Sequence, residues 1–151
     1  MYLLQIVRYF QLRSRQRLYE LDRDYGKLPH QPHHDCSYRV VISLSTIPER
    51  LNLLGPTLAS LLDQSVQVDE IAINVPYVSR KGKKYHVPKW LKRLRHVKLY
   101  RVEIDEGPGT KLLPTLRREK PETRIIVVDD DNIYHRETVR LLLKTHEKYL
   151  H

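Results

Sequence analysis

The most informative segment of the sequence is RIIVVDDDNIY, residues 124–134. A short apolar run at residues 125–128 is typical of a buried strand. It ends directly in three consecutive aspartates, although the chain as a whole has a formal net charge of +9. Ligands of open α/β sheets bind at the carboxyl ends of the strands. The triplet is therefore a candidate ligand site, provided that the strand belongs to such a sheet.

Apolar runs and helical repeats alternate on both sides of this stretch. Strands are expected at residues 38–46, 68–76, 96–104 and 123–130. Helices are expected at residues 49–65, 110–120 and 136–150. This alternation predicts an α/β domain of three layers with a mostly parallel sheet, in which the carboxyl ends of the strands lie at one edge.

The chain divides at KLPHQPHH, residues 27–34, because its prolines interrupt any helix. Residues 1–35 are expected to form an amphipathic helical segment and its Pro/His-rich linker, and residues 36–151 the compact domain. Apolar residues recur at helical spacing in the first segment, beside several arginines. We expect this helix to dock on the domain or on a second copy of the chain, giving a homo-oligomer. The alternative is a peripheral contact with a membrane surface.

The net charge results from 27 Lys and Arg residues against 18 Asp and Glu residues. Such a surface attracts nucleic acid, anionic lipid or phosphorylated ligands. A nucleic-acid partner is not expected, because the acidic triplet would repel a phosphate backbone. The single cysteine excludes an intramolecular disulfide and fits a reducing compartment. No stretch reaches the roughly 20 apolar residues of a membrane span, so a cytoplasmic protein is expected, with membrane association as the alternative.

The triplet has the chemistry of a divalent-cation site. Side chains alternate along an extended segment, so Asp129 and Asp131 are expected to point to one side and Asp130 to the other. Mg²⁺ and Mn²⁺ favour one or two carboxylates together with the phosphate oxygens of a substrate. The alternative is a solvated strand end, with Asp131 and Asn132 capping the next helix. Three aspartates in a row favour the ligand site.

Three segments together resemble a known family. VVISLSTIPERL (residues 40–51), GPGTKLLPTL (residues 107–116) and IIVVDDDNIYH (residues 125–135) occur in this order. They resemble the nucleotide-binding half of GT-A-type glycosyltransferases, in the family-2-like group with a DDD signature. The resemblance runs from about residue 38 to the end of the chain. It implies a Rossmann-like GT-A fold of the nucleotide-diphospho-sugar transferases that is short or truncated at its C-terminus.

The resemblance implies roles for the acidic triplet. Asp131 is similar to the main ligand of Mn²⁺ or Mg²⁺ in the family. Asp129 is similar to a residue that contacts the metal through water, or the ribose of the donor. Asp130 is expected to contact the donor sugar.

The resemblance also implies residues that hold the nucleotide. Thr46 and Arg50 are similar to residues that hold its base and ribose, and Asn74 is expected to do the same. Gly109 and Thr110 would let the backbone approach the donor, and Lys111 would face the base or the diphosphate. The basic stretch SRKGKK, residues 79–84, is expected to be a solvated loop, and closure over the diphosphate is the alternative.

The implied reaction transfers a sugar from a nucleotide-diphosphate sugar, with a UDP-sugar as the expected donor, to a hydroxyl of an unknown acceptor. An inverting transferase also needs a carboxylate base, and no catalytic base is identified. Twenty residues follow Asp131, and Glu137 and Glu147 among them are expected to be exposed helix charges. The alternative function is therefore a non-catalytic nucleotide-sugar-binding or regulatory module that lacks a complete acceptor site.

Overall fold

The structure is a computed structural model that describes residues 37–149. The expected N-terminal segment, with its predicted oligomer and membrane contacts, lies outside the described residues. The strands are β1 (Val40–Ser45), β2 (Glu70–Pro76), β3 (Val97–Val102) and β4 (Arg124–Val127). The α-helices are α2 (Gly55–Leu62), α3 (Leu113–Arg118) and α4 (Thr138–Tyr149). Short 3-10 helices are η2 (Leu51–Leu53), η3 (Lys89–Arg93) and η4 (Gly107–Lys111).

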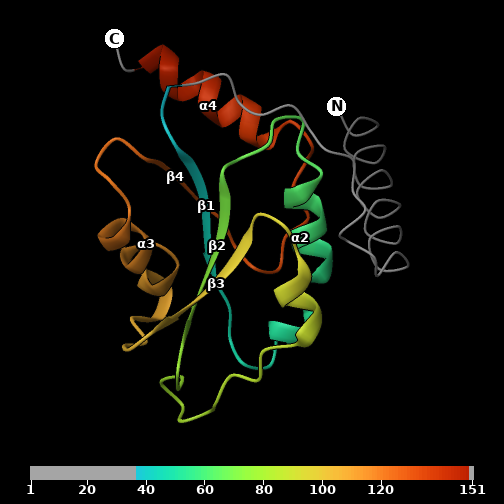
Figure 1. The fold of residues 1–151 in the computed structure, drawn as a ribbon, viewed down its shortest axis with the longest axis vertical. Helices are drawn as coiled ribbons and strands as arrows, with labels where there is room; N and C mark the ends of the chain where they lie inside the picture. The colour runs from blue at the N-terminus through green and yellow to red at the C-terminus, as the bar shows by residue number, and fades with distance from the viewer. Residues whose placement is uncertain (1–36, 150–151) are drawn as a thin grey trace, which may run out of the picture.

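The four strands form one sheet in the order β3-β2-β1-β4, and every neighbouring pair is parallel. Figure 1 shows β1 and β2 side by side in the middle of the sheet, with α2 and α3 on opposite sides of it. The prediction of a three-layer α/β domain with a parallel sheet is thereby confirmed. Parallel neighbours require crossover connections. The connection from β1 to β2 contains the predicted helix α2, whereas the connection from β2 to β3 contains only η3.

The strands and helices differ from the prediction mainly at their ends. The strand expected at residues 123–130 ends at Val127, so the whole acidic triplet lies in the loop that follows it. The helix expected from residue 49 begins at Gly55, with Pro56 in its first turn, where the missing N–H of proline has no cost. The residues before it form the separate turn η2.

The face of the sheet that α2 covers is apolar. Alternate residues of the two central strands are fully buried there, and α2, η2 and α4 add leucines and a valine. This core comprises Val40, Ile42, Leu44, Ile71, Ile73, Val75, Leu51, Leu54, Leu58, Val139 and Leu143, among others. Burial of such side chains contributes about 1.5–3 kcal/mol each to the free energy of folding, before the entropy cost.

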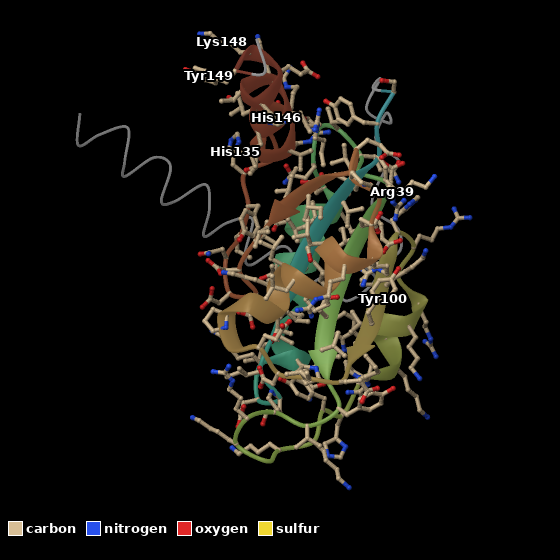
Figure 2. The ribbon with its side chains drawn as sticks, turned by 90° about the vertical axis from the view of Figure 1, so that its left-hand side faces the viewer. Arg39, Tyr100, His135, His146, Lys148 and Tyr149 are labelled. Atoms are coloured by element: carbon tan, nitrogen blue, oxygen red, sulfur yellow. The ribbon has the colours of Figure 1, made fainter. Side chains whose placement is uncertain are left out.

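The face that α3 covers, the polar face, carries a buried polar cluster beside the buried apolar residues Val41 and Ala72. Ser43 of β1, Asn74 of β2 and Thr115 of α3 are all fully buried, and their side chains are hydrogen-bonded to one another. Toward the start of the strands, Glu70 is buried beside Arg39 and Tyr100. Figure 2 turns this side of the sheet toward the viewer and labels both Arg39 and Tyr100. The two faces therefore use different forces: apolar burial on one and directed hydrogen bonds on the other.

Helix α4 closes one end of the molecule, where Figure 2 labels His146, Lys148 and Tyr149. Its residues Val139 and Leu143 are buried against the core. Within residues 37–149, no helix combines the length and the apolar character that crossing a membrane requires.

Candidate functional site

A cavity of about 450 Å³ opens at the carboxyl ends of the central strands. This volume lies within the usual range for small-molecule sites. Four segments line the cavity: the loop after β1, the basic loop after β2, η4, and the acidic triplet after β4. Of the residues predicted to bind the nucleotide or metal, it brings together Thr46, Arg50, Thr110, Lys111, Asp129 and Asp130. A hollow of about 770 Å³ along β3 contains none of these residues.

Asp130 is the buried member of the triplet, with 7% of its surface exposed. Its Oδ2 accepts a hydrogen bond of 2.5 Å from the Thr46 hydroxyl, and its Oδ1 lies 2.9 Å from Nη2 of Arg50. The Thr57 hydroxyl of α2 donates to the backbone carbonyl of Asp130 at 3.0 Å. Asp130 therefore joins the loop after β1 to the loop after β4.

Asp129 and Asp131 are exposed, in contrast to Asp130. Their side chains are 57% and 55% exposed, respectively. Burial therefore alternates along the triplet, but the expected grouping of Asp129 with Asp131 on one side is not found: Asp129 and Asp130 line the cavity, and Arg50 contacts both Asp130 and Asp131. The reason is that the triplet lies in the loop beyond β4, where the alternation of a strand no longer applies. Asp131 does not line the cavity itself; its Oδ2 accepts a hydrogen bond of 2.8 Å from Nη1 of Arg50 at the rim.

Lys111 pairs with Asp129 across the cavity, with 2.7 Å between Nζ and Oδ1. This hydrogen bond raises the pKa of Lys111 above its ordinary value, so the lysine is charged near neutral pH. The backbone of Asp129 is held by Tyr134, whose hydroxyl accepts from the Asp129 N–H at 2.7 Å and donates to its carbonyl at 3.2 Å. Tyr134 was not predicted from the sequence, because its contact depends on how the loop folds back.

The GPGT turn positions Lys111. Gly107 has a φ of +61°, and a Cβ there would lie 3.0 Å from Nη1 of Arg80. Asp105 accepts hydrogen bonds from the Gly107 N–H and from the Arg80 N–H. Thr110 is buried, and its hydroxyl accepts from the Glu106 N–H at 2.9 Å. Gly109, which was expected to approach the donor, is absent from the cavity lining, whereas Gly107, Pro108 and Thr110 line it.

Asn74 lies away from the cavity, contrary to the prediction that it holds the base or ribose. Its amide Nδ2 donates to the hydroxyls of Ser43 and Thr115, at 3.1 Å and 2.8 Å. The Ser43 hydroxyl in turn donates to the Lys111 carbonyl at 2.6 Å. Asn74 was expected at the end of its strand, but β2 continues to Pro76, and the Asn74 side chain is buried beneath α3 because it belongs to the polar face. Through Ser43, Asn74 therefore supports the backbone of Lys111.

The basic loop after β2 was expected to be solvated; its residues 80–84 are exposed, and it also forms a wall of the cavity. Lys83 is hydrogen-bonded to Glu49, and this bond lowers the pKa of the Glu49 carboxyl. Nε of Arg80 donates to the Asp105 carbonyl at 2.9 Å. The charge run SRKGKK, placed directly after a strand, was the signal that could have identified this wall.

Tyr85 forms part of the floor. Its hydroxyl donates to the Thr46 carbonyl at 3.0 Å. Burial raises the pKa of Tyr85 to about 12, and the neighbouring carboxylates of Asp105 and Glu49 add to this effect. Tyr85 is therefore a neutral donor under all ordinary conditions.

The donor set of the triplet suits a hard divalent ion bound together with a phosphate. No group of three or more His, Cys, Asp or Glu side chains is arranged around a metal position within residues 37–149. Mg²⁺, however, is usually held by one or two carboxylates with substrate phosphates and water. Asp129 and Asp131 provide two exposed carboxylates at the cavity rim, which fits that type of site better than a metal cage made of protein alone.

Comparison with protein-family models, curated proteins and solved structures finds no match to this chain. The resemblance to GT-A-type glycosyltransferases therefore depends on the three sequence segments, and the GT-A assignment stays a prediction.

Proposed function

We propose that this protein binds a nucleotide-diphosphate sugar together with Mn²⁺ or Mg²⁺ and transfers the sugar to an acceptor hydroxyl. A metal-dependent glycosyltransferase with a GT-A-type fold is the function that the cavity supports best. The main support is the convergence of the STIPER loop, the GPGTK turn and the DDD triplet around one cavity. These segments are separated by about 20 to 60 residues along the chain, and each carries groups that suit a charged nucleotide.

The chain's own groups divide the work of binding. Asp129 and Asp131 would hold the metal, which supplies neutralisation of the negative charge that grows on the leaving diphosphate. Arg50 and Lys111 supply positive charge on either side of the triplet. Arg80 and Lys83 place two further cations on the opposite wall. The expected UDP-sugar, the cytoplasmic location and the membrane contact stay predictions from the sequence.

A non-catalytic nucleotide-sugar-binding module is the second candidate, and the carboxylates of the cavity favour it. An inverting transferase needs a base near the acceptor hydroxyl. Outside the triplet, the cavity lining contains the carboxylates of Glu49 and Asp105. Glu49 is engaged by Lys83, and Asp105 by the backbone N–H groups of Arg80 and Gly107. Both carboxylates are therefore engaged in contacts within the cavity walls.

Calorimetric titration with UDP, in the presence and absence of Mn²⁺, tests the binding part of the proposal. We expect Mn²⁺-dependent binding that Asp131→Asn weakens by about tenfold or more, because a charge-assisted ligand is lost. Glu122→Gln is the matched control: it removes one negative charge at the opposite end of β4. Equal affinities with and without Mn²⁺, or equal losses in the two variants, would refute the proposed metal site.

An activity assay separates the two candidates. A transferase is expected to release UDP from a UDP-sugar, slowly to water or faster to a suitable acceptor. A binding module would bind the same donor with Mn²⁺ and return it intact. Chromatographic measurement of UDP after prolonged incubation, with Asp131→Asn as the blank, distinguishes these outcomes.

A further inference from the structure

The acidic triplet is neutralised in this structure by the same cations that line the cavity. Arg50 spans two carboxylates, with Nη2 at 2.9 Å from Asp130 and Nη1 at 2.8 Å from Asp131. Lys111 occupies the third, at 2.7 Å from Asp129. Both carboxylates that suit the metal are therefore hydrogen-bonded to a cation.

A divalent ion that binds these carboxylates comes close to both cations, because one oxygen of each carboxylate already accepts from Arg50 or Lys111. Its charge would repel both side chains, so binding of the metal alone is disfavoured. A diphosphate removes this obstacle, because it offers oxygens to the displaced cations and further ligands to the metal. The geometry thus favours entry of the metal and the diphosphate together.

The two cations differ in how they are anchored. Arg50 contacts the buried Asp130 through Nη2, and Asp130 is itself held by Thr46. Arg50 can therefore release Asp131 and stay on the cavity wall. Lys111 has an anchored backbone, since the Ser43 hydroxyl donates to its carbonyl, and a flexible side chain that can turn from Asp129 to a phosphate.

We propose that Arg50 and Lys111 are diphosphate ligands that exchange carboxylate for phosphate when the metal binds, and that Asp130 is the positioning residue for Arg50. This inference rests on the proposed metal-dependent nucleotide site. It assigns Arg50 to the diphosphate, whereas the family resemblance implies a contact with the base and ribose. In the absence of nucleotide, both cations compete with the metal; in its presence, both stabilise the complex.

The exchange predicts effects of opposite sign in one variant. Lys111→Gln frees Asp129 from its ion pair, so Mn²⁺ alone should bind several-fold more tightly than to the unchanged protein. The same variant should bind UDP in the presence of Mn²⁺ about tenfold more weakly, the effect of one lost charge-assisted hydrogen bond. Free Mn²⁺ measured by electron paramagnetic resonance gives the first affinity, and calorimetry gives the second.

Lys144→Gln is the control, because it removes one positive charge from an exposed position on α4. It measures the general effect of net charge on Mn²⁺ affinity, which should be small at physiological ionic strength. Arg50→Lys is a second test that keeps a cation beside the buried Asp130. It should weaken UDP binding, because lysine lacks the planar guanidinium with which Arg50 can contact Asp130 and a phosphate at once.

The outcomes distinguish this inference from the proposed function. If the unchanged protein binds Mn²⁺ and UDP together but Lys111→Gln weakens Mn²⁺ alone or leaves it unchanged, the exchange is wrong and the nucleotide site stands. If the unchanged protein binds no UDP at any Mn²⁺ concentration, both proposals are wrong. Tighter Mn²⁺ binding with weaker UDP binding in Lys111→Gln, and neither effect in Lys144→Gln, supports the exchange.

Discussion

The two faces of the sheet are stabilised by different interactions, although the same strands form both. Alternate residues of β1 and β2 pack against α2 in an apolar core, while the residues between them form hydrogen bonds beneath α3. Apolar burial is strong but has no direction. Hydrogen bonds contribute less to the free energy of folding but define positions. The cavity residue Lys111 is tied to the polar face through Ser43, so this face positions the Lys111 side of the candidate site, whereas Thr57 of α2 holds the backbone of Asp130.

The largest expected effect on stability comes from a substitution in the apolar face. Leu58→Ala in α2 removes a fully buried side chain and leaves a cavity in the core, so the free energy of unfolding should fall by about 3 kcal/mol. Urea denaturation followed by circular dichroism measures the change. Leu53→Ala, at a leucine with 68% exposure in η2, is the matched control and should stay within about 0.5 kcal/mol. Similar losses in both variants would contradict the assignment of the core.

A smaller effect is expected on the polar face, with a consequence for the site. Asn74→Ala removes two hydrogen bonds and should cost about 2 kcal/mol of unfolding free energy. Because Ser43 links this layer to the Lys111 backbone, UDP binding should also weaken, measured at a temperature where the variant is folded. Leu58→Ala at the same temperature should change UDP affinity less, despite its larger cost in stability. The reverse order would show that the polar face has no special role in positioning the site.

The smallest expected effect concerns the pH dependence that Glu70 gives to the polar face. Burial alone would raise the pKa of its carboxyl, but hydrogen bonds from Tyr100, Lys98 and Arg39 outweigh burial and lower it. A carboxyl with a lowered pKa in the folded state stabilises the protein above its ordinary pKa of 4.5 and loses that contribution as the pH falls through the folded value.

Stability should therefore decline on acidification below about pH 4.5, and Glu70→Gln should reduce the slope of that decline. Urea melts of both proteins at several pH values between 3 and 7 measure the two slopes. Glu103→Gln, at an exposed position after β3, is the control and should leave the slope close to that of the unchanged protein. An unaltered slope in Glu70→Gln would show that this buried carboxyl titrates normally.

Patterns in the sequence were enough to predict the strands, the helices and most segments of the site. The apolar run before Asp129 indicated a strand of a sheet, and alternation with helices predicted that the sheet is parallel. The strand was expected to be buried, but β4 is at the edge of the sheet, where Ile125 and Ile126 are half-buried and Val127 is exposed. Parallel strands share one carboxyl edge, so the loops after β1 and β4 were expected to lie close together, and Thr46, Arg50, Asp129 and Asp130 do meet there.

The folded structure was needed to show which side chains face the cavity and which partners they contact. Asn74 was assigned to the ligand because it was expected at the end of a strand, yet the alternation of that strand turns it beneath α3, where it is buried. Tyr85, Glu49 and Tyr134 gave no periodic signal, because their contacts depend on how irregular loops fold back. Ion pairs such as Lys111–Asp129 join residues far apart in the chain. Their distances depend on packing in three dimensions, which local sequence does not encode.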